Sequence, residues 1–105
     1  NRIICVFQPH TYSRTRAFWH EFAAALSLAD IVVLADVYAA RETDTLGIRS
    51  EDLAEEIRKL GTESYYFPTF DGIEKFLLKK CINKDLLITM GAGDVYKIGE
   101  ALLGN

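Results

Sequence analysis

The chain has 105 residues, of which 50% are hydrophobic and 26% charged, and its formal net charge is -3. This length fits one domain, and the composition is that of an ordinary globular protein. The longest apolar stretch, Ile31 to Ala35, is too short to cross a bilayer, and no run of Lys or Arg could neutralise a row of phosphates. We therefore expect a single soluble domain, residues 1–105, that binds neither nucleic acid nor a membrane.

The two cysteines, Cys5 and Cys81, stand in separate apolar contexts without C-x-x-C spacing. This pattern is typical of buried thiols in a reducing compartment, and it argues against a disulfide or a metal site. We expect a cytoplasmic location.

The first half of the chain predicts two strands and two helices. Ile3–Phe7 and Ile31–Ala35 are continuous apolar runs rich in β-branched residues, which is typical of strands buried on both faces. Between them, Thr15–Leu28 predicts one helix, whose apolar positions predict an inner face of Phe18, Phe22, Ala25 and Leu26, with Arg16, His20 and Glu21 opposite. Tyr38–Arg49 has no periodicity and predicts a loop.

A second helix follows this loop. Ser50 is the predicted N-cap, whose hydroxyl would accept a hydrogen bond from a free backbone N–H. Leu53, Ile57 and Leu60 form the predicted buried stripe, and Gly61 ends the helix where a left-handed residue is favoured.

The remaining third predicts two further strands and helices. Ser64–Phe67 is a weaker strand closed by Pro68, and Thr69 or Asp71 caps a helix that ends at Lys80, with Ile73, Phe76 and Leu77 facing inward. Leu86–Met90 is the last strand. The turn at 91–94 leads into a final helix with Val95, Ile98 and Leu102 on its inner face.

The resulting order, β-α-β-α-β-α-β-α, requires crossover helices. Crossovers produce a mostly parallel sheet with helices on both faces, and hence an α/β fold of three layers. Ligands of such sheets bind beyond the carboxyl ends of the strands. Candidate binding residues should therefore lie in the loops 8–14, 36–42 and 91–94.

In the loop 8–14, Arg14 offers a planar guanidinium that can bind a carboxylate in bidentate fashion, and His10 can donate to an anion or hold a proton. The free N–H groups at the start of the following helix would also favour an anion. Equally, Arg14 could be a solvated residue of the helix start and His10 a loop residue bonded to backbone.

The other two loops carry weaker signals. In the loop 36–42, Asp36 could accept from an amine or cap a turn, Tyr38 offers a flat ring, and Arg41 and Glu42 could form a surface pair. Gly91-Ala92-Gly93-Asp94 resembles half of a dinucleotide fingerprint, but the third glycine is absent because Tyr96 stands there. Its glycines more readily permit a tight turn and close approach of backbone to a ligand.

Several other chemistries are disfavoured by the sequence. A Walker A loop, a G-x-S-x-G nucleophile elbow and a cluster of metal ligands are all missing from it. We therefore expect no catalytic nucleophile and no metal ligand in this chain.

Three motifs in order, Phe7-Gln8-Pro9-His10-Thr11-Tyr12-Ser13-Arg14-Thr15, Asp36-Val37-Tyr38-Ala39-Ala40-Arg41-Glu42 and Met90-Gly91-Ala92-Gly93-Asp94, resemble the C-terminal domain of the Mur ligase family. The resemblance runs from Arg2 to about Leu103. It implies a Rossmann-like fold and a role in peptidoglycan biosynthesis, and thereby in cell-wall biogenesis, cell shape and cell division.

The resemblance also implies an activity for the full enzyme. ATP and Mg²⁺, bound mainly by a central domain, would activate UDP-N-acetylmuramate, and the C-terminal domain would receive L-alanine. The implied substrate-binding residues here are His10, Thr11, Arg14, Tyr38, Ala39, Gly91, Ala92 and Gly93. Thr11 stands where many relatives carry arginine, so a second carboxylate contact from that position is in question.

Relatives carry an Asp-Asp-Tyr-Ala-His-His-Pro segment before the first strand, and its aspartate contacts the nucleotide. The chain begins after this segment, so we expect a domain trimmed at its N-terminal edge, without a cofactor of its own and inactive alone. Two alternatives stay open: a sibling Mur-type ligase that joins a preformed peptide during cell-wall recycling, and a stand-alone, non-catalytic Rossmann-like binding module.

Overall fold

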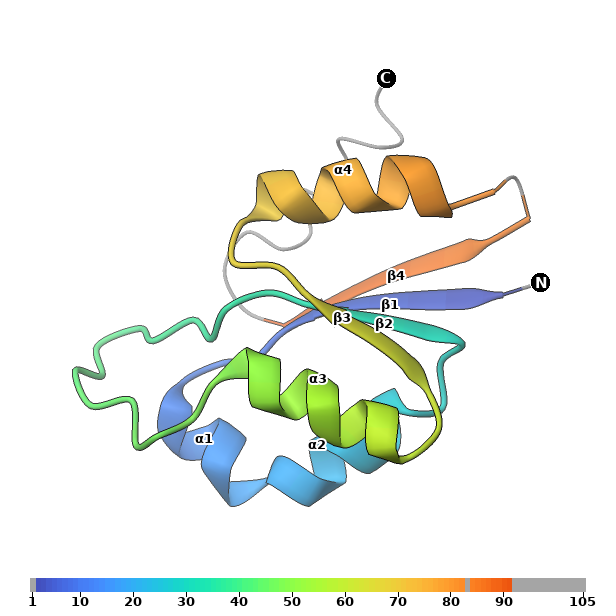
Figure 1. Cartoon of the computed structure of the whole chain (residues 1–105). Helices are drawn as coiled ribbons and strands as arrows, with labels where there is room; N and C mark the ends of the chain where they lie inside the picture. Colours follow the sequence, from blue (N-terminus) through green and yellow to red (C-terminus); the bar gives the residue numbers. More distant parts are fainter. Residues whose placement is uncertain (1, 83, 92–105) are drawn as a thin grey trace.

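The structure, a computed structural model, describes residues 2–82 and 84–91, and Figure 1 shows their arrangement. The described elements, in chain order, are β1 (Ile3–Gln8), α1 (Tyr12–Ala17), α2 (Trp19–Leu26), β2 (Ile31–Leu34), α3 (Ser50–Lys59), β3 (Glu63–Tyr66), α4 (Phe70–Lys80) and β4 (Leu86–Gly91). The predicted loop at 38–49 contains no helix or strand. The predicted final helix lies outside the described residues. None of the described helices is long and apolar enough to span a membrane.

The four strands form one sheet in the order β3-β2-β1-β4, and every neighbouring pair is parallel. The chain winds in one direction from β1 to β3 and then returns across the sheet to β4. Because strand crossovers are right-handed, the outward connections and the return connection lie on opposite faces. Figure 1 shows α1, α2 and α3 on one face and α4 on the other. The predicted three-layer α/β architecture is confirmed.

The core consists of two apolar layers separated by the sheet. Ile4 and Val6 of β1 pack with Ile73 and Leu77 of α4 on one face. Their neighbours Cys5 and Phe7 point to the other face, where α2 and α3 contribute Ala23, Leu26, Leu53, Ala54 and Ile57. This burial on both faces explains why β1 and β2 are continuous apolar runs.

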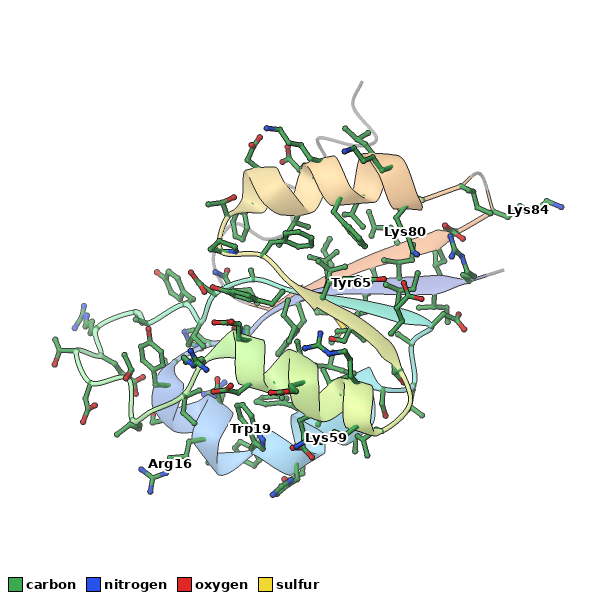
Figure 2. All side chains as sticks on the ribbon, viewed as in Figure 1. Arg16, Trp19, Lys59, Tyr65, Lys80 and Lys84 are labelled. Atoms are coloured by element: carbon green, nitrogen blue, oxygen red, sulfur yellow. The ribbon has the colours of Figure 1, made fainter. Side chains whose placement is uncertain are left out.

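The first predicted helix, at 15–28, is wrong in its start and in its continuity. The structure has two helices, because Thr11 Oγ1 accepts from the Arg14 N–H and starts α1 earlier, while Phe18 leaves helical geometry at φ -115°, ψ 27°. Because of this break, the residues that face the sheet differ from the predicted ones. Phe18 is 49% exposed and Ala25 is exposed, whereas Ala23 and Leu26 are buried. In Figure 2, Arg16 points from α1 away from the sheet.

Two details of the second predicted helix are also wrong. Ser50 is the first residue of α3 and not its N-cap, and its buried hydroxyl donates to the Ala35 carbonyl at 2.6 Å. Leu60 is 52% exposed because it is the C-cap, and Ala54 is buried on the inner face with Leu53 and Ile57. Gly61 ends the helix at φ +94°, as predicted.

The later predictions hold with small shifts. Thr69, not Asp71, caps α4 by accepting from the Gly72 N–H at 3.1 Å. Of the two free thiols, Cys5 is buried as predicted, whereas Cys81 is only half-buried.

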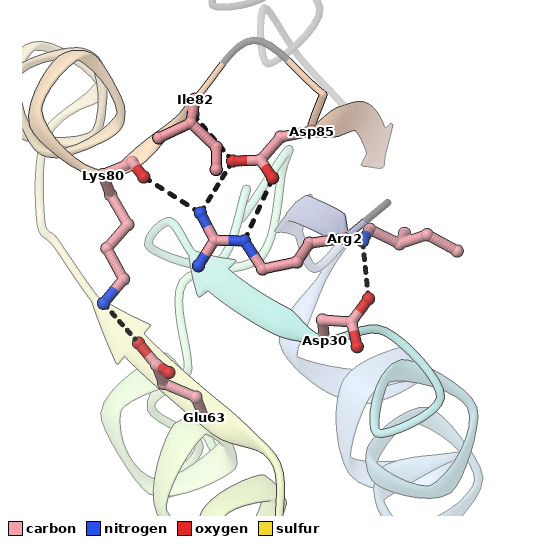
Figure 3. A network of polar contacts seen from close by, with 7 residues as sticks. Arg2, Asp30, Glu63, Lys80, Ile82 and Asp85 are labelled. Carbon is pink, nitrogen blue, oxygen red and sulfur yellow. Dashed lines mark hydrogen bonds and ion pairs between the residues drawn. The ribbon is translucent and has the colours of Figure 1, made fainter.

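A polar network fastens the amino-terminal edge of the sheet (Figure 3). Arg2 donates to the Asp85 carboxylate through Nε at 3.0 Å and Nη2 at 2.8 Å, and Nη2 also reaches the Lys80 carbonyl. Lys80 in turn pairs with Glu63 at 3.0 Å. The network links the residues at the starts of β1, β3 and β4 to one another, at the edge of the sheet opposite the one where the strands end.

Candidate functional site

The carboxyl ends of β1 and β4 meet at the point where the strand order reverses. The chain leaves β1 toward β2, whereas β4 arrives on the other side of β1, and their last residues, Gln8 and Gly91, are partners in register. Loops leaving such a switch point diverge to opposite sides of the sheet and leave a crevice between them. The first loop predicted to bind a ligand, 8–14, begins here.

A cavity of about 310 Å³ lies at this switch point, lined by Phe7, Gln8, His10, Arg14, Phe22 and Gly91. Three of the predicted site residues, His10, Arg14 and Gly91, thus lie around one cavity. Arg14 is exposed, and within residues 2–82 and 84–91 it forms no salt bridge. None of these residues neutralises its guanidinium, which lies beside apolar walls from Phe7 and Phe22.

Gly91 allows the two strand ends to approach closely. Its φ is +116°, and a Cβ at this position would lie 2.1 Å from the Gln8 carbonyl oxygen and 2.9 Å from the Gln8 nitrogen. Only glycine fits this backbone without displacing β1. The close approach that the sequence predicted for the glycine turn is thus made to Gln8 of the protein itself. Ala92 and Gly93 lie outside the described residues.

The loops after β1 and β2 are joined through His10 and Tyr38. The Thr11 N–H donates to the Tyr38 carbonyl and the Tyr38 N–H donates to the Pro9 carbonyl, both at 2.8 Å. The rings of His10 and Tyr38 stack with centroids 5.7 Å apart and planes 17° apart. Tyr38 therefore packs against the face of the His10 ring. Tyr38 itself is not among the described residues that line the cavity.

The start of α1 differs from the prediction that it offers free N–H groups to a ligand. Glu42 accepts hydrogen bonds from the backbone N–H groups of Tyr12 and Ser13 and from the Ser13 hydroxyl. Thr11 Oγ1 accepts from the Arg14 N–H, so Thr11 caps the helix. Three donors of the first turn are thus already satisfied by the protein, and the interpretation of Glu42 as half of a surface pair with Arg41 is wrong.

Asp36 and Ala39 have structural roles in the loop after β2. Asp36 accepts from the Tyr66 hydroxyl, and burial, followed by this hydrogen bond, raises the pKa of Tyr66 to about 12. Ala39 accepts from the Glu42 N–H at 3.0 Å in a turn that aims the Glu42 side chain at α1.

Gln8 lines the cavity at the switch point, and it belongs to the predicted loop 8–14, although the sequence assigned it no binding role. Its side chain is buried, and Nε2 donates to the Asp36 carbonyl at 3.1 Å, whereas Oε1 has no partner among the described residues. A glutamine at the end of an otherwise apolar strand was the available signal, because a polar group in a buried strand needs a specific partner.

A larger hollow of about 490 Å³ lies between α3 and β3, away from these loops. Both arginines that line it already have partners: Arg49 pairs with Asp52 at 3.0 Å, and Arg58 donates to the Ser64 carbonyl at 2.8 Å. Among the described residues it thus offers an anionic ligand no unpaired arginine, in contrast to the smaller cavity at the switch point.

The described residues fit neither a magnesium ion nor a triphosphate. Within 2–82 and 84–91, no three His, Cys, Asp or Glu side chains gather as ligands. Among the described residues, Arg14 is the only cation that lines the cavity, whereas a triphosphate needs several donors around it. The cavity suits a small molecule with one anionic group.

Fold and cavity together define a Rossmann-like α/β domain with a small cavity of mixed polar and apolar lining at its switch point. A family model described as Mur ligase, glutamate ligase domain, matches residues 1–93. The chain is 68% identical over 103 residues to a UDP-N-acetylmuramate–L-alanine ligase of Lachnospira eligens and 61% identical over 101 residues to that of Lachnoclostridium phytofermentans. These matches cover 98% and 96% of the chain. The chain belongs to the Mur ligase family.

A solved structure supports the same assignment. The crystal structure of the UDP-N-acetylmuramate-alanine ligase from Thermotoga maritima matches 99% of this chain with a TM-score of 0.72 and 26% identity. The match covers 20% of that protein, and the chain spans 22% of the length of the curated relatives named above.

Proposed function

We propose that this chain is the C-terminal domain of an ATP-dependent ligase that joins L-alanine to UDP-N-acetylmuramate in peptidoglycan synthesis in the cytoplasm. Its contribution is the amino-acid site. In the proposed reaction, ATP phosphorylates the muramoyl carboxylate, the amine of L-alanine attacks the acyl phosphate, the C–N bond forms and phosphate leaves.

The observation that carries the proposal is Arg14 at the cavity on the switch point. A guanidinium that pairs with no carboxylate of the described residues, beside two aromatic walls, suits a small molecule that has a carboxylate and a short apolar side chain. At about 310 Å³ the cavity is at the lower end of the range for small-molecule sites, about 300–1,000 Å³. His10 and Gln8 supply polar groups on its wall that can orient an amine.

ATP and magnesium belong, in this proposal, to the remainder of the enzyme. Magnesium would neutralise charge on the transferred phosphoryl group there. The role of this domain is then to hold the amino acid and bring its amine to the acyl phosphate, which is catalysis by positioning. Because the site would be completed by closure against the other domains, we expect the 105-residue chain alone to be inactive.

The test is phosphate release by the full-length enzyme with ATP, magnesium and UDP-N-acetylmuramate. We expect release that depends on L-alanine and not on D-alanine or a preformed peptide. Release that depends on the peptide would instead identify the sibling ligase of cell-wall recycling. No release with either acceptor would contradict both and favour a non-catalytic binding module.

A further inference from the structure

Glu42, which the proposed function does not use, accepts four hydrogen bonds from Tyr12 and Ser13 at the start of α1. It lies in the loop after β2, half-buried, and its carboxylate accepts from two consecutive backbone N–H groups and one hydroxyl of α1. From Ser13 N, Oε1 is 3.2 Å and Oε2 is 3.3 Å away, so both oxygens face the same turn.

These contacts favour the ionised carboxylate. The Ser13 hydroxyl and the backbone N–H groups of Tyr12 and Ser13 all donate to it, and these hydrogen bonds, that of the Ser13 hydroxyl first, lower the pKa of Glu42 below its usual value. Glu42 is therefore charged at neutral pH. Hydrogen bonds to a charged acceptor are stronger than neutral ones, which makes this contact more than a loose surface pair.

The contact completes a second link between the two loops. The first link is the backbone pairing between His10 and Tyr38, and the second joins Glu42 to the residues that immediately precede Arg14. A short helix held at two places has little freedom to rotate. The two links hold the loop and the first helical turn from which Arg14 extends.

We propose that Glu42 is a positioning residue that holds the first turn of α1, and with it Arg14, in the orientation that binds the amino acid. The proposal rests on the proposed function, in which Arg14 binds the carboxylate of the amino acid. It adds the residue that holds Arg14 in place for this contact. Glu42 does not touch the substrate.

The test compares Glu42→Gln and Glu42→Ala in the full-length enzyme. Displacing a binding group by about 1 Å costs up to about a hundredfold in rate. We expect the KM for L-alanine to rise about tenfold or more in Glu42→Ala and less in Glu42→Gln, which keeps one acceptor oxygen. The KM for ATP and for UDP-N-acetylmuramate should stay near wild-type values, because the proposed function places their sites mainly in the other domains.

Asp44→Asn is the matched control, since Asp44 lies in the same loop and, among the residues that the structure describes, accepts only from the Leu46 N–H, at 2.9 Å. Ser13→Ala removes one of the hydrogen bonds to Glu42 and should raise the same KM modestly, so a poorly folded Glu42 variant does not end the test. An unchanged KM for L-alanine in both Glu42 variants, or equal rises for all three substrates, would overturn the proposal. An inactive wild-type enzyme would overturn the proposed function instead.

Discussion

Replacing Gly91 by alanine tests the close approach of the carboxyl ends of β1 and β4 beside the cavity. The added Cβ would meet the Gln8 oxygen, nitrogen and carbonyl carbon at 2.1, 2.9 and 3.0 Å. These are backbone atoms of a central strand, so no side chain can move aside to relieve the contact. Relief requires β1 and β4 to separate at the last pair of their register.

The size of the effect follows from two costs. A non-glycine residue at a strained positive φ costs about 1–3 kcal/mol. Forcing extra volume against packed atoms costs about 1–3 kcal/mol more. Alanine also reduces the entropy of the unfolded chain, which offsets about 0.4–1 kcal/mol of these costs. We therefore expect Gly91→Ala to lower the free energy of unfolding by about 3 kcal/mol.

Gly61→Ala is the matched control for the first cost alone. Gly61 has φ +94° and no atom within 4 Å of a built Cβ. Since alanine also reduces the entropy of the unfolded chain, by about 0.4–1 kcal/mol, we expect a loss of only about 1 kcal/mol here. Urea unfolding of the 105-residue chain, followed by circular dichroism, measures both. Equal losses in the two variants would refute the close approach of β4 to Gln8.

Two further predictions concern buried polar groups. Ser50→Ala should lower the free energy of unfolding by about 1–2 kcal/mol in the same urea assay, because the Ala35 carbonyl loses its donor. Ser64→Ala should be neutral or slightly stabilising, because the buried Ser64 hydroxyl has no partner among the described residues. Burial raises the pKa of the Cys5 thiol to about 11. The thiol ionises more readily in the unfolded chain than in the folded protein, so the free energy of unfolding should fall by about 2 kcal/mol as the pH rises from 9 to 11. Cys5→Ala should lose less stability over that interval. Parallel curves of unfolding free energy against pH for the two proteins would contradict this prediction.

The fold could be predicted from the sequence because β1 and β2 are buried on both faces. Strands of this kind appear in the sequence as continuous apolar runs. A helix between two such runs predicts that the strands are parallel. The break at Phe18 was not predictable in the same way. Its apolar side chain fits a helical stripe, and only packing against the sheet decides that Ala23, and not Phe18, is buried.

For the candidate site, the sequence could predict which loops lie together, but not which side chains contact one another. The carboxyl-end rule pointed to His10, Arg14 and Gly91, and these residues do line one cavity. The partner of the α1 N–H groups could not be found, because Glu42 is about thirty residues away from Ser13 and meets it only through the sheet topology. Long-range polar contacts of this kind leave no periodic signal in a sequence.

The most direct test of the central claim is the KM for L-alanine of the full-length enzyme carrying Arg14→Lys. Lysine keeps the positive charge but cannot bind a carboxylate in bidentate fashion, so the carboxylate should be held less well. We expect the KM for L-alanine to rise about tenfold, in line with the loss of roughly 1.4 kcal/mol of binding, while the KM for ATP stays unchanged. An unchanged KM for L-alanine would contradict the assignment of Arg14 and of its cavity to the amino acid.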